Sequence, residues 1–273
     1  MDPGCSTPLT QSLLNSLTSS WTSLHEIYFH GLVEVTDWSP LQRLPHLALC
    51  DLYSMRSHQP FTLPLTCLPP KVEMLGLQNV KVVDADKALT LRSSLKSLNL
   101  YHKALWSPRV NGGIDMLSWL ASCPALHTLT LELDMMAYAR RLDLAPISRH
   151  HSPLHALRKL SPQLRRLELF FADSGQDTPT QLLDSRLIRD LSCCTQLEQL
   201  ELWNAYGDDW SPRTSVRPLG RLKQLRHLRM EAVPHGLASS VRSVMLSQVP
   251  HCRLRLVVDN EPTAGPDDFA PDG

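Results

Sequence analysis

The segment Leu197-Glu-Gln-Leu200-Glu-Leu202 has apolar residues at its first, fourth and sixth positions. The fourth and sixth positions are two residues apart, so in an extended chain their side chains point to the same side. The third, fifth and seventh positions point to the other side and are mostly polar. The segment is therefore predicted to form a short strand with one buried face.

The same pattern recurs nine times along the chain. The copies begin at residues 24, 44, 72, 95, 126, 164, 197, 225 and 251, with a mean period of about 28 residues and intervals from 20 to 38 residues. One such strand cannot bury its apolar face alone, but stacked copies can do so by forming a parallel sheet. Parallel strands need crossover segments of about a dozen residues or more. The repeat predicts an α/β solenoid with a parallel concave sheet and with helices or irregular segments on the convex side.

Helices are predicted in several of the intervening segments. Apolar residues recur with helical spacing in residues 113–122, 180–192 and 237–248. A further helix is expected to end near Ser20, before the first copy. The triplet Trp-Ser-Pro occurs at residues 38–40, 106–108 and 210–212, and we interpret its serine as a helix N-cap and its proline as the first helical residue.

The chain resembles the leucine-rich repeat family, of the long ribonuclease-inhibitor-like kind. The segment Leu120-Ala-Ser-Cys123-Pro-Ala-Leu126-His-Thr-Leu129-Thr-Leu131 is similar to repeats that follow F-boxes in ubiquitin-ligase substrate receptors. No F-box is readable here, and the Asn or Cys usual at the ninth repeat position is missing. The resemblance implies a curved solenoid whose concave sheet is lined by the third, fifth and seventh positions of each copy.

We predict one repeat domain over residues 1–258, with eight or nine repeats, followed by a disordered tail. Residues 259–273 are acidic and rich in proline and glycine, as disordered segments often are. The insert around residues 139–162 contains His150 and His151 and is expected to lie at the periphery of the repeats.

The composition excludes several classes of function. The chain has 27 basic and 27 acidic side chains and no net charge, which argues against a generally basic nucleic-acid-binding protein. No run approaches the ~18 apolar residues of a membrane-spanning helix. No signal peptide is readable, and seven irregularly spaced cysteines suggest reduced thiols. We therefore expect a cytoplasmic protein, with the nucleus as the alternative location.

No catalytic, cofactor or metal site is predicted. The chain contains no GxSxG, GxxxxGK[ST], GxGxxG or HExxH motif. His151 and His155 could share a helix face, but no carboxylate or cysteine stands at a convincing ligand spacing. We expect a monomeric, non-enzymatic protein that needs no cofactor and acts through its surface.

The candidate surface is the concave face of the predicted sheet. In the second copy its outward positions are His46, Ala48 and Cys50. Aromatic and arginine side chains, which are common in protein interfaces, concentrate on the later copies. The predicted partner-binding residues are Tyr101, Arg166, Phe170, Trp203, Arg229, Arg253 and Arg255. The arginines are expected to favour an acidic segment of another protein.

Alternative interpretations of this surface remain open from sequence. Arg229 could simply balance the charges of Glu168 and Glu201, and loops could cover Phe170 and Trp203. A nucleic-acid site is disfavoured because glutamates lie among the arginines. Two functions are therefore carried forward: a protein-binding scaffold, and a substrate-recognition subunit of a ubiquitin ligase whose F-box is missing or divergent.

Overall fold

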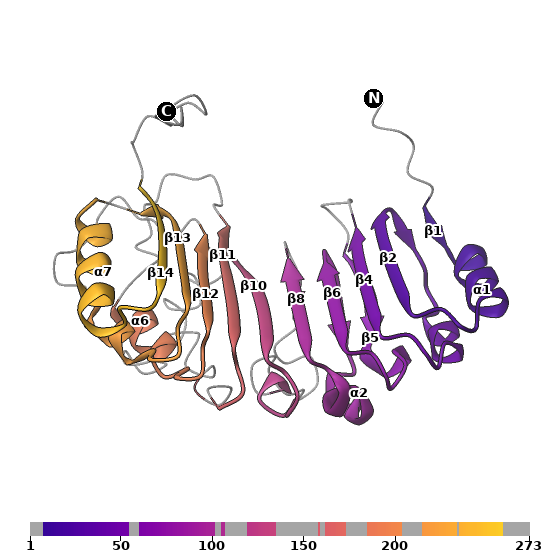
Figure 1. Ribbon diagram of the computed structural model, residues 1–273. Coiled ribbons are helices and arrows are strands. Elements are labelled where there is room, and N and C mark those ends of the chain that lie inside the picture. The colour runs from indigo at the N-terminus through magenta and orange to yellow at the C-terminus, as the bar shows by residue number, and fades with distance from the viewer. Residues whose placement is uncertain are drawn as a thin grey trace, which may run out of the picture.

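The computed structural model describes residues 8–54, 60–101, 105–106, 119–134, 158, 162–172, 185–203, 215–233 and 235–258. These residues form an elongated, curved solenoid built on one nine-stranded sheet (Figure 1). The strands are β2 (Glu26–Gly31), β4 (Leu49–Ser54), β6 (Met74–Gln78), β8 (Ser97–Tyr101), β10 (Thr128–Asp134), β11 (Arg166–Ala172), β12 (Gln199–Trp203), β13 (His227–Val233) and β14 (Arg253–Val258).

All neighbouring strands of this sheet are parallel and follow one another in chain order. The register aligns equivalent repeat positions, so that Leu167 lies opposite Leu200, which lies opposite Leu228. A parallel sheet made of repeating Leu-x-x-Leu-x-Leu strands is the leucine-rich repeat fold. The predicted fold class is therefore confirmed.

The hydrophobic core lies on one side of the sheet and runs the length of the solenoid. It is made by the first, fourth and sixth positions of the repeats, and Leu197, Leu200 and Leu202 are all fully buried. At the two ends the equivalent side chains are only half-buried, as Phe29 on β2 and Leu256 on β14 illustrate. The end strands lack a neighbouring repeat on their outer side, which explains this difference.

The predicted frame of the second copy is wrong by three residues. Cys50 pairs with Ile27 and Leu75, so the copy reads Leu47-Ala-Leu-Cys50-Asp-Leu52. Cys50 is fully buried, and Leu49, Asp51 and Tyr53 take the outward positions instead of His46, Ala48 and Cys50. Both frames satisfy the apolar pattern locally, but only the observed one aligns with its neighbours. The first four copies then begin at residues 24, 47, 72 and 95, at nearly even intervals.

Short segments connect the strands on the core side. In the first half they include the 3-10 helices η1 (Ser39–Arg43), η2 (Leu65–Cys67) and η3 (Ala85–Lys87), the helix α2 (Leu89–Ser94), and a second parallel sheet of β5 (Phe61–Pro64), β7 (Val80–Val83) and β9 (Leu105–Trp106). A 3-10 helix or a strand covers more distance per residue than an α-helix does. Such elements therefore suit the short intervals of this half.

Three of the predicted helices are present. Helix α1 (Gln11–Ser20) ends at the expected residue and packs beside η1, next to the short pair β1 (Leu9–Thr10) and β3 (Val33–Glu34). Helices α6 (Ser185–Leu191) and α7 (His235–Gln248) lie in the later intervals with η5 (Arg217–Arg221), and α7 flanks β14 at one end of the solenoid (Figure 1). Most of the helix predicted at 113–122 lies outside the described residues.

The first Trp-Ser-Pro triplet begins a 3-10 helix, but its serine is not the cap. The N-cap residue is Trp38, whose side chain makes no capping hydrogen bond, and the backbone N–H of Ser39 donates to Asp37 Oδ1 at 2.9 Å. Trp38 is fully buried, contacts Phe61, and donates from Nε1 to the carbonyl oxygen of Thr62 at 2.9 Å. The tryptophan is therefore a core residue that ties this repeat to the next.

Cys50, Cys123 and Cys194 are predicted to resist thiol reagents in the folded chain. All three are buried, and burial raises the pKa of each thiol to about 12, which leaves almost no reactive thiolate near pH 8. Labelling with DTNB or iodoacetamide and peptide mapping should modify them only after denaturation, with half-buried Cys193 as the comparison. Rapid native labelling of Cys50 would contradict the observed frame of the second copy.

The described strands all belong to the repeat solenoid. The predicted disordered tail and the predicted peripheral insert stay predictions. The predicted acidic tail, residues 259–273, lies outside the described residues, as does nearly all of the insert at 139–162. The domain boundary at residue 258 is therefore not tested.

Candidate binding surface on the open face of the sheet

We call the side of the nine-stranded sheet that faces away from the core the open face. It carries the third, fifth and seventh positions of every repeat, and parallel pairing in register arranges them in three rows across the strands. The fifth positions form one row from Tyr28 on β2 to Arg255 on β14. The seventh positions form a second row beside it, near the carboxyl ends of the strands.

Five aromatic side chains make a nearly continuous line along the seventh positions. The ring of His30 lies 4.5 Å from that of Tyr53, and Tyr53 lies 5.8 Å from Tyr101, reaching across β6. Tyr101 meets Phe170 edge-on at 5.9 Å across β10, and Phe170 stacks on Trp203 at 5.2 Å. We call these five residues the aromatic row. Because the core lies on the other side of the sheet, the row places apolar surface on the solvent side.

Trp203 lies at the C-terminal end of the aromatic row between two neighbours. One face of its ring stacks on Phe170 at an interplanar angle of 10°, and the guanidinium of Arg229 lies 3.8 Å from its centroid. This cation–π contact holds Arg229 against the row. Phe170 and Arg229 thus approach Trp203 from the strands on its two sides, and its buried Nε1 has no hydrogen-bond partner among the residues that the structure describes.

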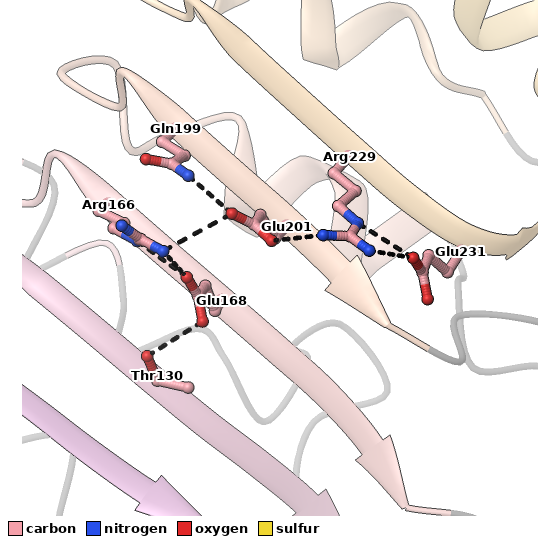
Figure 2. Close-up of polar contacts among 7 residues, drawn as sticks. All are labelled: Thr130, Arg166, Glu168, Gln199, Glu201, Arg229 and Glu231. Atoms are coloured by element: carbon pink, nitrogen blue, oxygen red, sulfur yellow. Dashed lines mark hydrogen bonds and ion pairs between the residues drawn. The ribbon is translucent and has the colours of Figure 1, made fainter. Parts of the chain in front are cut away.

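Beside the aromatic row, three glutamates and two arginines form a network across β11, β12 and β13 (Figure 2). Arg166 donates from Nε to Glu168 Oε1 at 2.8 Å, and its Nη2 lies 3.7 Å from Glu201 Oε1. Arg229 donates from Nε to Glu231 Oε1 at 3.0 Å, and its Nη1 lies 3.9 Å from Glu201 Oε2.

The network satisfies carboxylates that are largely removed from water. The side chains of Glu168 and Glu201 are only 11% and 12% exposed. Gln199 donates to Glu201 at 2.6 Å, and the Thr130 hydroxyl lies 3.5 Å from Glu168. A carboxylate at this depth needs charged or hydrogen-bonding partners. Arg166 and Arg229 thus have structural roles within the sheet, and it is Arg166 that pairs with Glu168.

Arg253 and Arg255 differ from the other predicted binding residues. They lie on β14, the edge strand of the sheet, and both are exposed. Within the described part of the chain neither makes an ion pair. The structure therefore joins Tyr101, Phe170, Trp203 and Arg229 in one line of contacts, places Arg166 beside it, and leaves these two arginines at the edge.

Asp51 lies on β4, in the N-terminal part of the open face. Its side chain leans over Gly76 on the next strand, where an added Cβ would lie 1.9 Å from Oδ1, so a larger residue at position 76 would force the Asp51 carboxylate to move. Burial raises the pKa of the Asp51 carboxyl, while the charge of His30 and a hydrogen bond from Tyr53 partly offset this rise. Burial, and then the same carboxylate, raise the pKa of the Tyr53 hydroxyl.

The predicted frame of the second copy missed Tyr53. The repeat pattern placed His30 at a seventh position of the concave face, but His30 was not among the predicted binding residues. Tyr53 was lost because the second copy was placed three residues too early. Counting Cys50 as an apolar core residue would have revealed the alternative frame and placed Tyr53 at a seventh position. No sequence signal indicates that the rings of Tyr53 and Tyr101 meet across an intervening strand.

The remaining site predictions are only partly covered by the described residues. Among those residues, no three His, Cys, Asp or Glu side chains are grouped as metal ligands, while His150, His151 and His155 lie outside them. The helices that the structure describes include none of sufficient length and hydrophobicity to cross a membrane. Residues 173–184 and 204–214, which follow β11 and β12, are not described, so covering of Phe170 and Trp203 by loops is not tested.

Comparisons with known proteins add a likeness in fold. No protein-family model and no curated protein sequence matches this chain. Among solved structures, the chain is similar to an internalin C2 from Listeria monocytogenes, with 16% sequence identity and a TM-score of 0.44. That likeness covers 92% of this chain and 88% of the internalin. The leucine-rich repeat assignment rests on this chain's own strands and register.

Proposed function

We propose that this protein is a non-catalytic scaffold that binds another protein on the open face of its repeat sheet. The observation that carries the proposal is the aromatic row. Aromatic side chains gathered on the solvent side of a rigid sheet contribute little to the core, but they offer a large contact area with little conformational entropy to lose. Tyrosine, tryptophan and arginine are also the residues most enriched at interface hot spots.

The partner is expected to contact the middle and C-terminal parts of the row. Tyr101 and Phe170 are half-buried and lie where the row crosses β8 to β11. Trp203 is half-buried and contributes the part of its ring that Phe170 and Arg229 leave open. Arg253 and Arg255 remain available at the edge of the sheet for further polar contacts.

The test compares affinity purifications with the double variant Tyr101→Ser/Phe170→Ser and with wild type, using quantitative mass spectrometry. Both substitutions remove open-face rings and leave the leucine core unchanged, so the fold should persist by circular dichroism. Partners of the open face should be depleted by about fivefold or more, since loss of a hot-spot residue costs ~1–2 kcal/mol or more. The matched control is Leu246→Ser, which removes an apolar side chain that is 62% exposed on α7. Equal recovery with all three proteins would place the binding site elsewhere.

A ubiquitin-ligase role is the finer alternative and rests on the resemblance of the repeats to those of F-box proteins. The ribonuclease-inhibitor-like subtype also stays a prediction. The same holds for the monomeric state and for the cytoplasmic or nuclear location of the protein. In the same purification, recovery of ligase adaptor subunits with both wild type and the double variant would support the ligase role. Loss of open-face partners without any adaptor subunit would favour the plain scaffold.

A further inference from the structure

We infer that the segment recognised by the open face is an extended chain of net positive charge. This inference rests on the proposed function and adds the chemical class of the partner. It also differs from the expectation based on the arginines in the sequence, which favoured an acidic partner.

On the open face, strands β2 to β13 carry more negative than positive charge. Their outward positions hold six carboxylates and only two guanidiniums, and the carboxylates belong to Glu26, Asp51, Glu132, Glu168, Glu201 and Glu231. Both guanidiniums are engaged inside the network: Arg166 with Glu168 and Glu201, and Arg229 with Glu201 and Glu231. The arginines therefore do not offer free positive charge, and these strands present an excess of negative charge.

Carboxylates and aromatic rings lie side by side on the open face. Cationic side chains bind favourably to both, through charge-assisted hydrogen bonds and through cation–π contacts. The structure already contains one such arrangement, in which Arg229 lies against Trp203 and binds Glu231. Lysine or arginine side chains of a partner can repeat it along the row, where Asp51 lies beside Tyr53.

The aromatic row has the length of a short extended peptide. From β2 to β12 it crosses six strand-to-strand steps, a length of roughly 29 Å at about 4.8 Å per step. An extended segment of about nine residues covers that distance at ~3.3 Å per residue. The exposed Arg253 and Arg255 would repel cations at β14, so the basic part of the segment should lie over β2 to β12.

The probe for the test is a display library of random twelve-residue peptides, selected on the full chain in about 50 mM NaCl. Enriched peptides should carry an excess of lysine and arginine, and their binding should weaken as salt is raised, because salt screens the attraction between the basic peptide and the negatively charged face. Binding should also fall in the Tyr101→Ser/Phe170→Ser variant. Enrichment of neutral or acidic peptides would overturn the inference.

Charge removal provides the sharper test. The triple variant Asp51→Asn, Glu132→Gln, Glu231→Gln keeps side-chain size and removes three negative charges from the open face. We expect it to bind the enriched peptides about tenfold more weakly or worse. The matched control Asp86→Asn removes one exposed charge on η3, away from the open face, and should bind as wild type does. Equal binding by the triple variant and wild type would overturn the inference.

The two proposals fail in different ways. In one outcome, the enriched peptides are acidic, need Tyr101 and Phe170, and bind more weakly to the Arg253→Ala/Arg255→Ala variant. The open face would then still be the binding site, but the partner's charge would be negative rather than positive. Peptides whose binding ignores the aromatic row altogether would contradict the proposed function as well.

Discussion

Leu200→Ala is expected to lower the free energy of unfolding by about 2–5 kcal/mol, because it removes buried methyl groups and leaves a cavity. Leu200 is fully buried on β12, and the residues opposite it in the register, Leu167 and Leu228, are fully buried as well. Both neighbours are held in their own repeats, so the core cannot readily close the gap. Urea unfolding followed by circular dichroism measures the change.

Two further variants test whether this cost comes from the stacked core. Leu246→Ala removes the same atoms from an exposed site on α7 and should change stability by less than ~0.5 kcal/mol. Leu167→Ala combined with Leu200→Ala should deviate from the sum of the single effects, because the two cavities adjoin. A Leu200→Ala protein as stable as Leu246→Ala would mean that the repeat register is wrong.

Arg166→Met is expected to lower the free energy of unfolding by about 1–3 kcal/mol near neutral pH, because it leaves buried acceptors without their donor. Arg166 pairs with both Glu168 and Glu201, whose side chains are only 11% and 12% exposed. These two carboxylates lie opposite each other on adjacent strands, so removal of the shared guanidinium also leaves like charges together. Thermal or urea unfolding reports the loss.

A compensating substitution separates charge from packing in this result. Adding Glu168→Gln to Arg166→Met should restore part of the stability, since Glu168 has then lost its arginine partner whereas Glu201 still has Gln199 and Arg229. The matched control is Lys96→Met, which breaks an ion pair with Glu73 at 2.7 Å whose side chains are 47% and 46% exposed. That change should cost less than ~1 kcal/mol, as exposed pairs usually do. An Arg166→Met effect no larger than the control would show that the network contributes little.

The binding surface was only partly predictable from sequence. The positions of Tyr101, Phe170 and Trp203 on the open face followed from the repeat pattern, because the seventh position always points away from the core. Their mutual contacts did not follow, since Tyr101 and Phe170 meet across β10 from strands far apart in the chain. The sequence raised charge balance between Arg229 and the glutamates only as an alternative. That Arg229 binds Glu231 on its own strand and lies on Trp203 of the neighbouring strand β12 came from the structure.

The sequence by itself determined the repeat strands, their parallel stacking and the side of each strand that faces the core. These follow from a two-residue alternation that each copy carries locally, repeated often enough that stacking is the only way to bury the leucines. Only the tertiary structure decided which of two overlapping frames the second copy uses. It also decided that five rings form one aromatic row and that Arg166 and Arg229 are engaged by glutamates. Those outcomes depend on which side chains neighbouring strands place side by side, and no single repeat contains that information.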